Sequence, residues 1–105
     1  MSKESPLSVV DVPEAVKAAL VEFFRGLGRD IDELDDETDL IKDTGATSDE
    51  GVDFAIDLSD LLGVPVPNTF NPFVHPSGRR GMKLRELIDH AGRLVREAKE
   101  VDHAD

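Results

Sequence analysis

Residues 47–67 read TSDEGVDFAIDLSDLLGVPVP, and this stretch decides the fold. It opens with the pattern of a capping box, in which Thr47 is followed three residues later by Glu50. Asp49 and Glu50 also place negative charge at the positive end of the helix dipole. Gly63 is a typical residue for the end of a helix. The stretch therefore predicts a helix that begins near Thr47 and ends near Gly63.

Two kinds of side chain divide the surface of this predicted helix. Its apolar residues cover a wide face that we expect to meet the core. One helical face holds Val52, Ile56, Ser59 and Leu62, and Phe54, Leu58 and Leu61 widen it. Four aspartates at i, i+4, i+8 and i+11 form a separate acidic stripe: Asp49, Asp53, Asp57 and Asp60.

The acidic stripe has two interpretations, and the sequence leaves both open. No Lys or Arg occurs from residue 43 to residue 78, so nothing nearby in the sequence neutralises the stripe. It is either a docking face for a basic protein surface, which raises association rates, or a solvated face that keeps the chain soluble.

Two further segments carry helical periodicity, so we predict an all-α fold. Residues 13–27 form the first, with Asp11 as a candidate N-cap and Pro13 in the first turn. Residues 83–100 form the last and clearest. Its apolar positions are Leu84, Leu87, Ile88, Ala91, Leu94, Val95 and Ala98.

The segments between the helices are long. Residues 29–47 are polar, and their sparse apolar residues favour an ordered loop pinned to the core over an acid-rich disordered segment. Four prolines rule out a long helix over 64–81, although one short helical turn fits near residues 68–74. The 68–81 stretch is either a rigid connector, which we favour, or a docking loop. We expect flexible tails at 1–10 and 101–105 around one domain at 11–100.

Composition excludes several classes of function. The chain has 105 residues, a formal net charge of −11 and no cysteine. Such a charge disfavours nucleic acid and anionic membranes as partners. No apolar run has the length of a signal peptide or a membrane span, so we expect a cytoplasmic monomer.

The histidines His75, His90 and His103 match no metal motif, and no nucleophile–base pattern appears. We therefore expect no enzyme activity, no catalytic residue and no metal site.

The stretch GATSDEGVD at 45–53 resembles the modification site of acyl carrier proteins, which show a Gly-x-Asp-Ser-Leu motif. Val52 and Asp53 occupy the family's Val/Ile and acid four and five residues after the serine. LLGVPVP at 61–67 is similar to the family's segment ending in Ile-Pro, without a gap from Ser48. Residues 38–43 look like the family's loop just before the motif, and weaker similarity at 83–88 matches the start of its last helix, so the resemblance extends over residues 12–97.

The resemblance implies a fold and a function. The fold is a right-handed four-helix bundle with a short third helix and a long loop between helices one and two. Ser48 would carry 4'-phosphopantetheine, and the acidic stripe would dock on basic enzyme surfaces. The partners would be a phosphopantetheinyl transferase and acyl-transferring enzymes of fatty acid or secondary metabolite biosynthesis.

The chain departs from the family pattern at two positions. Thr47 replaces the aspartate before the serine, and Asp49 replaces the leucine after it, which is an apolar contact for partner enzymes in the family. An alternative function is therefore an unmodified acyl-carrier-like adaptor with no prosthetic group. A third, weaker hypothesis is a stress or inhibitor protein that mimics an acidic polymer.

Overall fold

The computed structural model describes residues 8–31 and 34–103. Its helices are α1 (Val12–Gly26), α2 (Ser48–Leu62) and α3 (Leu84–His103), and a 3₁₀ turn, η1 (Val9–Asp11), precedes α1. The residues described contain no β-strand, only two isolated bridges. The predicted all-α class is confirmed.

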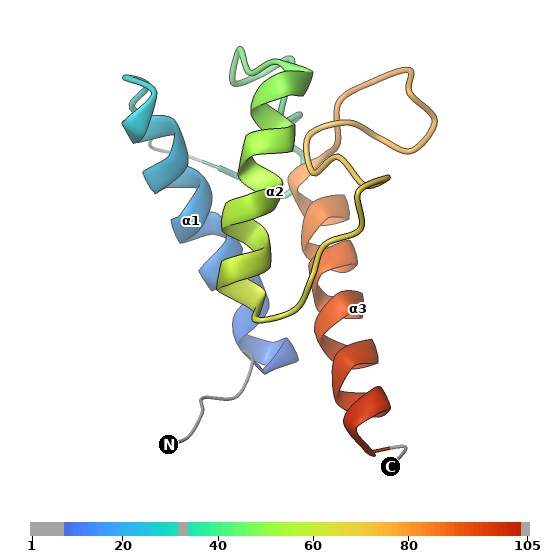
Figure 1. Cartoon of the computed structure of the whole chain (residues 1–105). Coiled ribbons are helices and arrows are strands. Elements are labelled where there is room, and N and C mark those ends of the chain that lie inside the picture. The colour runs from blue at the N-terminus through green and yellow to red at the C-terminus, as the bar shows by residue number, and fades with distance from the viewer. Residues whose placement is uncertain (1–7, 32–33, 104–105) are drawn as a thin grey trace.

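The three helices lie side by side, and α1 runs antiparallel to α2 and α3 (Figure 1). Helix α1 contacts both α2 and α3, while η1 packs against α1 and α3. One end of the bundle holds the end of α1 and the beginnings of α2 and α3 (Figure 1). The candidate serine and most of the loop residues therefore gather at this end.

The N-terminus of α1 differs from the prediction in one respect. Asp11 occupies the N-cap position, but its carboxylate accepts a hydrogen bond from the Ser8 hydroxyl at 3.1 Å and does not cap the helix. The reason is that η1 leads directly into α1, so Asp11 has helical backbone angles instead of the extended ones of a capping residue. At the other end of α1, Gly28 adopts φ +82°, which lets the chain turn sharply away.

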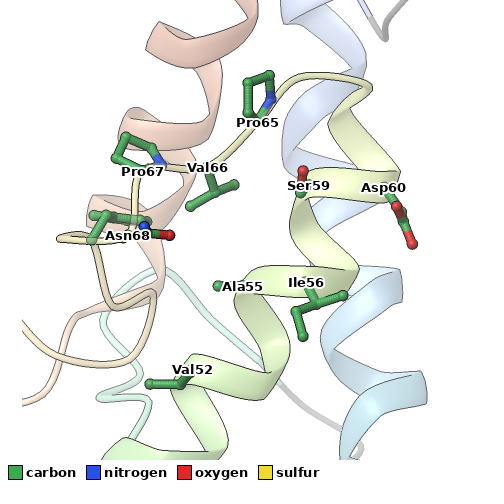
Figure 2. A pocket seen from close by; sticks show the side chains of 10 residues that line it. Val52, Ala55, Ile56, Ser59, Asp60, Pro65, Val66, Pro67 and Asn68 are labelled. Atoms are coloured by element: carbon green, nitrogen blue, oxygen red, sulfur yellow. The ribbon is translucent and has the colours of Figure 1, made fainter.

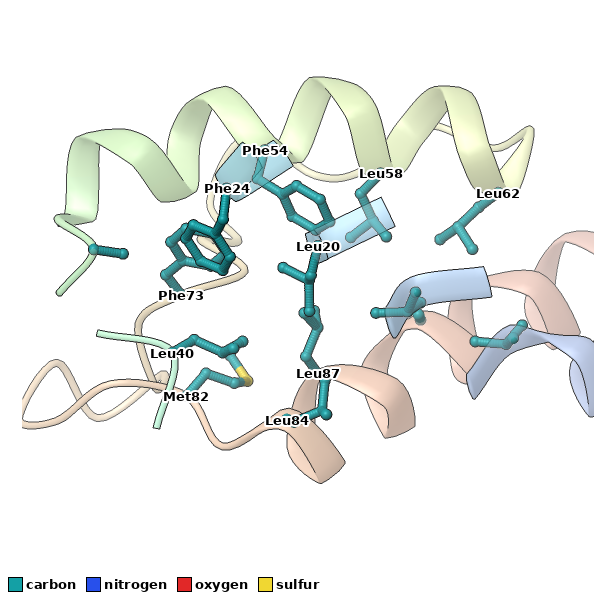
Figure 3. Packing of buried hydrophobic residues seen from close by; sticks show 14 of the residues in the cluster. Leu20, Phe24, Leu40, Phe54, Leu58, Leu62, Phe73, Met82, Leu84 and Leu87 are labelled. Atoms are coloured by element: carbon teal, nitrogen blue, oxygen red, sulfur yellow. The ribbon is translucent and has the colours of Figure 1, made fainter. Parts of the chain in front are cut away.

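The core lies between the three helices and is closed at one end by loop residues (Figure 3). Its centre is a group of phenylalanines: the Phe73 ring stacks on Phe54 and Phe24, with centroid distances of 5.6 and 5.7 Å. Other fully buried side chains from the helices are Val16, Leu20, Leu58, Leu62, Leu84, Leu87, Ala91 and Val95. Leu40 and Met82 from the two long connections complete it.

The face by which α2 packs is narrower than the predicted apolar face and is centred on a different side of the helix. Val52 and Ile56, which we expected in the core, are 57% and 64% exposed. The buried face consists of Gly51 together with Phe54, Leu58 and Leu62, three residues that the predicted face already included. The apolar residues of α2 cover so much of its circumference that periodicity alone fits both faces. The aromatic partners of Phe54, which come from distant segments, determine which face is buried.

The connection at 27–47 is pinned to the core, as the ordered-loop prediction required. Leu40 is fully buried, and its backbone N–H donates to the Met82 carbonyl at 2.9 Å. An isolated bridge also pairs Asp39 with Lys83, whereas a second one, between Val74 and Gly81, lies within the connection from α2 to α3. The two long connections are thus linked to each other through their backbones.

The segment between α2 and α3 forms turns where a short third helix was predicted. Pro72 disfavours helical backbone at the residue before it, which explains why residues 68–73 do not close into a helix. Of the predicted tails, residues 1–7 and 104–105 lie outside the described residues. The remainder differs from the expectation, because Val9 and Val10 belong to η1 and α3 continues past residue 100 to His103.

Candidate functional site

Ser48 is the first residue of α2 and is exposed. The predicted capping box is present beside it: Thr47 Oγ1 accepts from the Glu50 backbone N–H at 3.2 Å, and Glu50 accepts from the Thr47 N–H at 3.1 Å. Within residues 8–31 and 34–103, no group hydrogen-bonds to the Ser48 hydroxyl. Because Thr47 supplies the cap, the Ser48 hydroxyl can be modified without the helix losing a capping hydrogen bond.

Glu50 connects the Ser48 turn to the end of α1. Its two carboxylate oxygens accept from the Arg29 guanidinium at 2.9 and 3.3 Å, and both side chains are partly buried. This hydrogen bonding holds the pKa of Glu50 below its usual range, against the opposing effect of desolvation. The carboxylate therefore stays ionised at neutral pH and fixes the turn from outside α2.

The acidic stripe lies along the outside of α2. Asp49, Asp53, Asp57 and Asp60 are all exposed. None of them takes part in an ion pair with another residue that the structure describes. The stripe thus presents uncompensated negative charge to solvent, beginning at the residue after Ser48.

An apolar groove of about 340 Å³ runs beside the stripe, between α2 and residues 65–70 (Figure 2). Val52 and Ala55 point into it from α2, and Val66 faces them from the other wall (Figure 2). Val52 lies one helical turn after Ser48, about 6 Å along the axis. The groove therefore begins close to the serine and continues along the same side of α2.

Sequence reasoning missed this groove because it placed Val52 and Ile56 in the core. One signal was available in the sequence. Ser59 lies on the helical face of Val52 and Ile56, and a hydroxyl is unusual at the centre of a core face. In the structure the Ser59 hydroxyl donates to the Val64 carbonyl at 3.0 Å, at the end of the groove.

His75 and His90 both lie against other side chains of the fold. His75 Nε2 lies 4.0 Å from Glu86, which also pairs with Arg80 at 2.7 Å. The Arg80 hydrogen bond lowers the pKa of Glu86 to about 2. The His90 ring packs against Phe70 at 5.0 Å, and burial lowers its pKa. In the part of the chain that the structure describes, no three His, Asp or Glu side chains are arranged to hold a metal ion.

Comparison of the chain with models of protein families, with curated proteins and with solved structures gave no match. Among the described residues, no helix has the length and apolar character needed to cross a membrane. The site is therefore defined by its own geometry. It consists of an exposed serine on a capped helical turn, an apolar groove that starts one turn away, and an acidic stripe beside it.

Proposed function

We propose that the chain is an acyl-carrier-like protein that tethers acyl or similar groups on a 4'-phosphopantetheine arm at Ser48. The observation that carries the proposal is the placement of Ser48, exposed at the start of a 15-residue helix whose cap comes from Thr47. The unpaired N–H groups of a helix N-terminus favour a phosphodiester. When bound, the arm would supply a thiol that holds the carried group as a thioester.

The residues present fit such an arm in three respects. The Ser48 turn is held rigid by the capping box and by the Glu50–Arg29 pair, so the hydroxyl has a defined position. The groove beside Val52 offers apolar surface within a short distance of the serine. The order of α1, a long connection, α2 and α3 also supports the proposal, although turns at 68–73 stand where an acyl carrier has its third helix.

Docking on basic enzymes is the second part of the proposal. Four exposed aspartates flank two exposed apolar side chains, Val52 and Ile56, on one helix. Charge of one sign steers an oppositely charged partner and sets its orientation, while the apolar side chains add contact area. The role implies a phosphopantetheinyl transferase and acyl-transferring enzymes as partners, in cytoplasmic fatty acid or secondary metabolite biosynthesis.

Intact-mass measurement tests the modification. The purified chain is incubated with coenzyme A and a broad-specificity phosphopantetheinyl transferase, and we expect a gain of one phosphopantetheine mass. Ser48→Ala should abolish the gain and leave the circular dichroism spectrum unchanged. Asp49→Leu should raise the rate, because it removes negative charge beside the incoming phosphate and adds an apolar contact. Absence of modification in both the natural chain and Asp49→Leu would exclude the carrier function.

Charge reversal tests the docking face. Asp53→Lys and Asp57→Lys should each raise the KM of the transferase for this chain, and added salt should reduce the difference. Glu14→Lys is the matched control, because it makes the same charge change at an exposed position on α1. An equal effect of Glu14→Lys would show that net charge matters and that the stripe has no specific role.

The alternative function is an unmodified adaptor, and the surface of α2 supports it. The acidic stripe and the exposed Val52 and Ile56 do not depend on Ser48, and Asp49 stands where carriers have leucine. An unmodified chain could bind a basic partner through this surface alone. Modification of Asp49→Leu but not of the natural chain would indicate a carrier-like protein that has lost its arm.

A further inference from the structure

Asn71 lies in the connection between α2 and α3, yet its side chain binds the first turn of α2. Its Nδ2 donates to the Ser48 carbonyl at 2.9 Å, across 23 residues of sequence. Its Oδ1 accepts from the Phe73 backbone N–H at 2.9 Å. Both ends of the amide are used, which fixes the orientation of the side chain.

Gly51 provides the space that Asn71 occupies. A Cβ atom at position 51 would overlap Oδ1 of Asn71 and would lie only 2.9 Å from Cβ of Phe73. Glycine is unfavourable inside a helix, so its presence in the first turn of α2 needs a reason. The close approach of Asn71 supplies that reason.

The segment that carries Asn71 is itself anchored on both sides. Phe70 packs against the His90 ring of α3 at 5.0 Å. Phe73 is fully buried and stacks on Phe54. Asn71 therefore cannot follow a movement of the Ser48 turn without disturbing the core, so it holds that turn against a fixed support.

We infer that Asn71 is a positioning residue, which holds the Ser48 turn in the orientation that presents the hydroxyl for modification. The capping box fixes the turn only relative to α2 itself, whereas Asn71 fixes it relative to the aromatic core and α3. The part that concerns modification rests on the proposed function. The part that concerns the position of the turn does not.

Asn71→Asp is the most selective variant, because it keeps the size and the acceptor oxygen and loses the Nδ2 donor. Arg79→Gln is the matched control, since it makes the same change of one negative unit in net charge at an exposed residue of the same connection, away from the groove. Amide hydrogen exchange measures the turn directly. In Asn71→Asp we expect exchange at Gly51 and Val52 to accelerate by about tenfold, with exchange at Leu58 changed less than twofold.

Transferase kinetics measure the consequence for Ser48. Asn71→Asp should lower kcat by about tenfold and leave KM within twofold, because the docking surface is intact and the hydroxyl is misplaced. Arg79→Gln should change neither quantity. If the natural chain is never modified, the proposed function fails, and the exchange measurement alone still decides whether Asn71 holds the turn.

Three results would overturn the inference. Unchanged exchange at Gly51 and Val52 would show that Asn71 does not hold the turn. Equal acceleration at Leu58 would show that Asn71 merely stabilises the whole fold. A rise in KM with kcat unchanged would indicate that Asn71 contacts the enzyme directly and does not position Ser48.

Discussion

Replacement of Glu50 by alanine removes two supports of the Ser48 turn at once. The carboxylate accepts from the Thr47 N–H at 3.1 Å and from Arg29 at 2.9 and 3.3 Å. Loss of the capping contact costs about 0.5–1 kcal/mol. Loss of the partly buried ion pair costs roughly another 0.5–1 kcal/mol. We expect the free energy of unfolding to fall by about 1.5 kcal/mol in total.

Urea denaturation at pH 7 measures this change. With an m-value of about 1.5 kcal/mol/M, the midpoint of unfolding of Glu50→Ala should fall by about 1 M. Glu50→Gln is the matched control, because its carbonyl still accepts from Thr47 and Arg29 without the charge. Its midpoint should fall by about half as much. A midpoint shift below roughly 0.2 M for Glu50→Ala would refute the reasoning, because neither contact would then contribute.

The pH dependence of the same pair adds an independent check. Since the pKa of Glu50 is lowered in the folded state, its contribution is complete above the unfolded value of about 4.5 and is lost as pH falls through the folded value. The difference between the natural chain and Glu50→Ala should therefore shrink below about pH 4.5. A difference that grows on acidification would contradict the assigned ion pair.

Other perturbations distinguish buried from peripheral positions. Leu87→Ala should lower the free energy of unfolding by about 2–4 kcal/mol, because Leu87 is fully buried. Ile88 is only partly buried, so Ile88→Ala should lower it by less than half as much, and equal decreases would mean that α3 is rotated. Gly63→Ala should cost about 1 kcal/mol in urea unfolding, because Gly63 ends α2 with φ 72°, and a neutral result would argue against that geometry. Burial lowers the pKa of His90, so the free energy of unfolding should decrease as pH falls below about 6.5, and His90→Gln should remove that part of the pH profile.

The sequence allowed the ends of α2 to be predicted because the signals are local. The capping box at Thr47 and the left-handed Gly63 act within one turn of the helix. The packing face was beyond such reasoning, because Val52 and Phe54 are both apolar and lie on neighbouring faces. Phe54 is buried since Phe23 and Phe73 meet it from elsewhere in the chain, at centroid distances of 5.2 and 5.6 Å.

The features of the candidate site also fall into two groups, those with local signals in the sequence and those that depend on distant segments. Exposure of Ser48 and of the acidic stripe followed from their place on a capped helix. The groove and the Asn71 contact did not, because each joins residues of α2 to a proline-rich segment whose path no periodicity describes. Gly51 was a local hint of the Asn71 contact, since glycine within a helix often marks a close approach of another segment, as Ser59 was a hint of the groove.

The backbone hydrogen bonds that join the 27–47 connection to the start of α3 affect when the Ser48 turn becomes ordered during synthesis. Leu84 N–H donates to the Thr38 carbonyl and Arg85 N–H to the Asp36 carbonyl, so this end closes only when residues almost fifty positions apart meet. Contacts of such sequence separation form late in folding. Because a nascent chain emerges from its N-terminus, the Ser48 turn leaves the ribosome well before its supports at Asn71 and the start of α3. We therefore expect a ribosome-bound chain that ends before α3 to present Ser48 on an unsupported turn, so that modification follows release of the complete bundle.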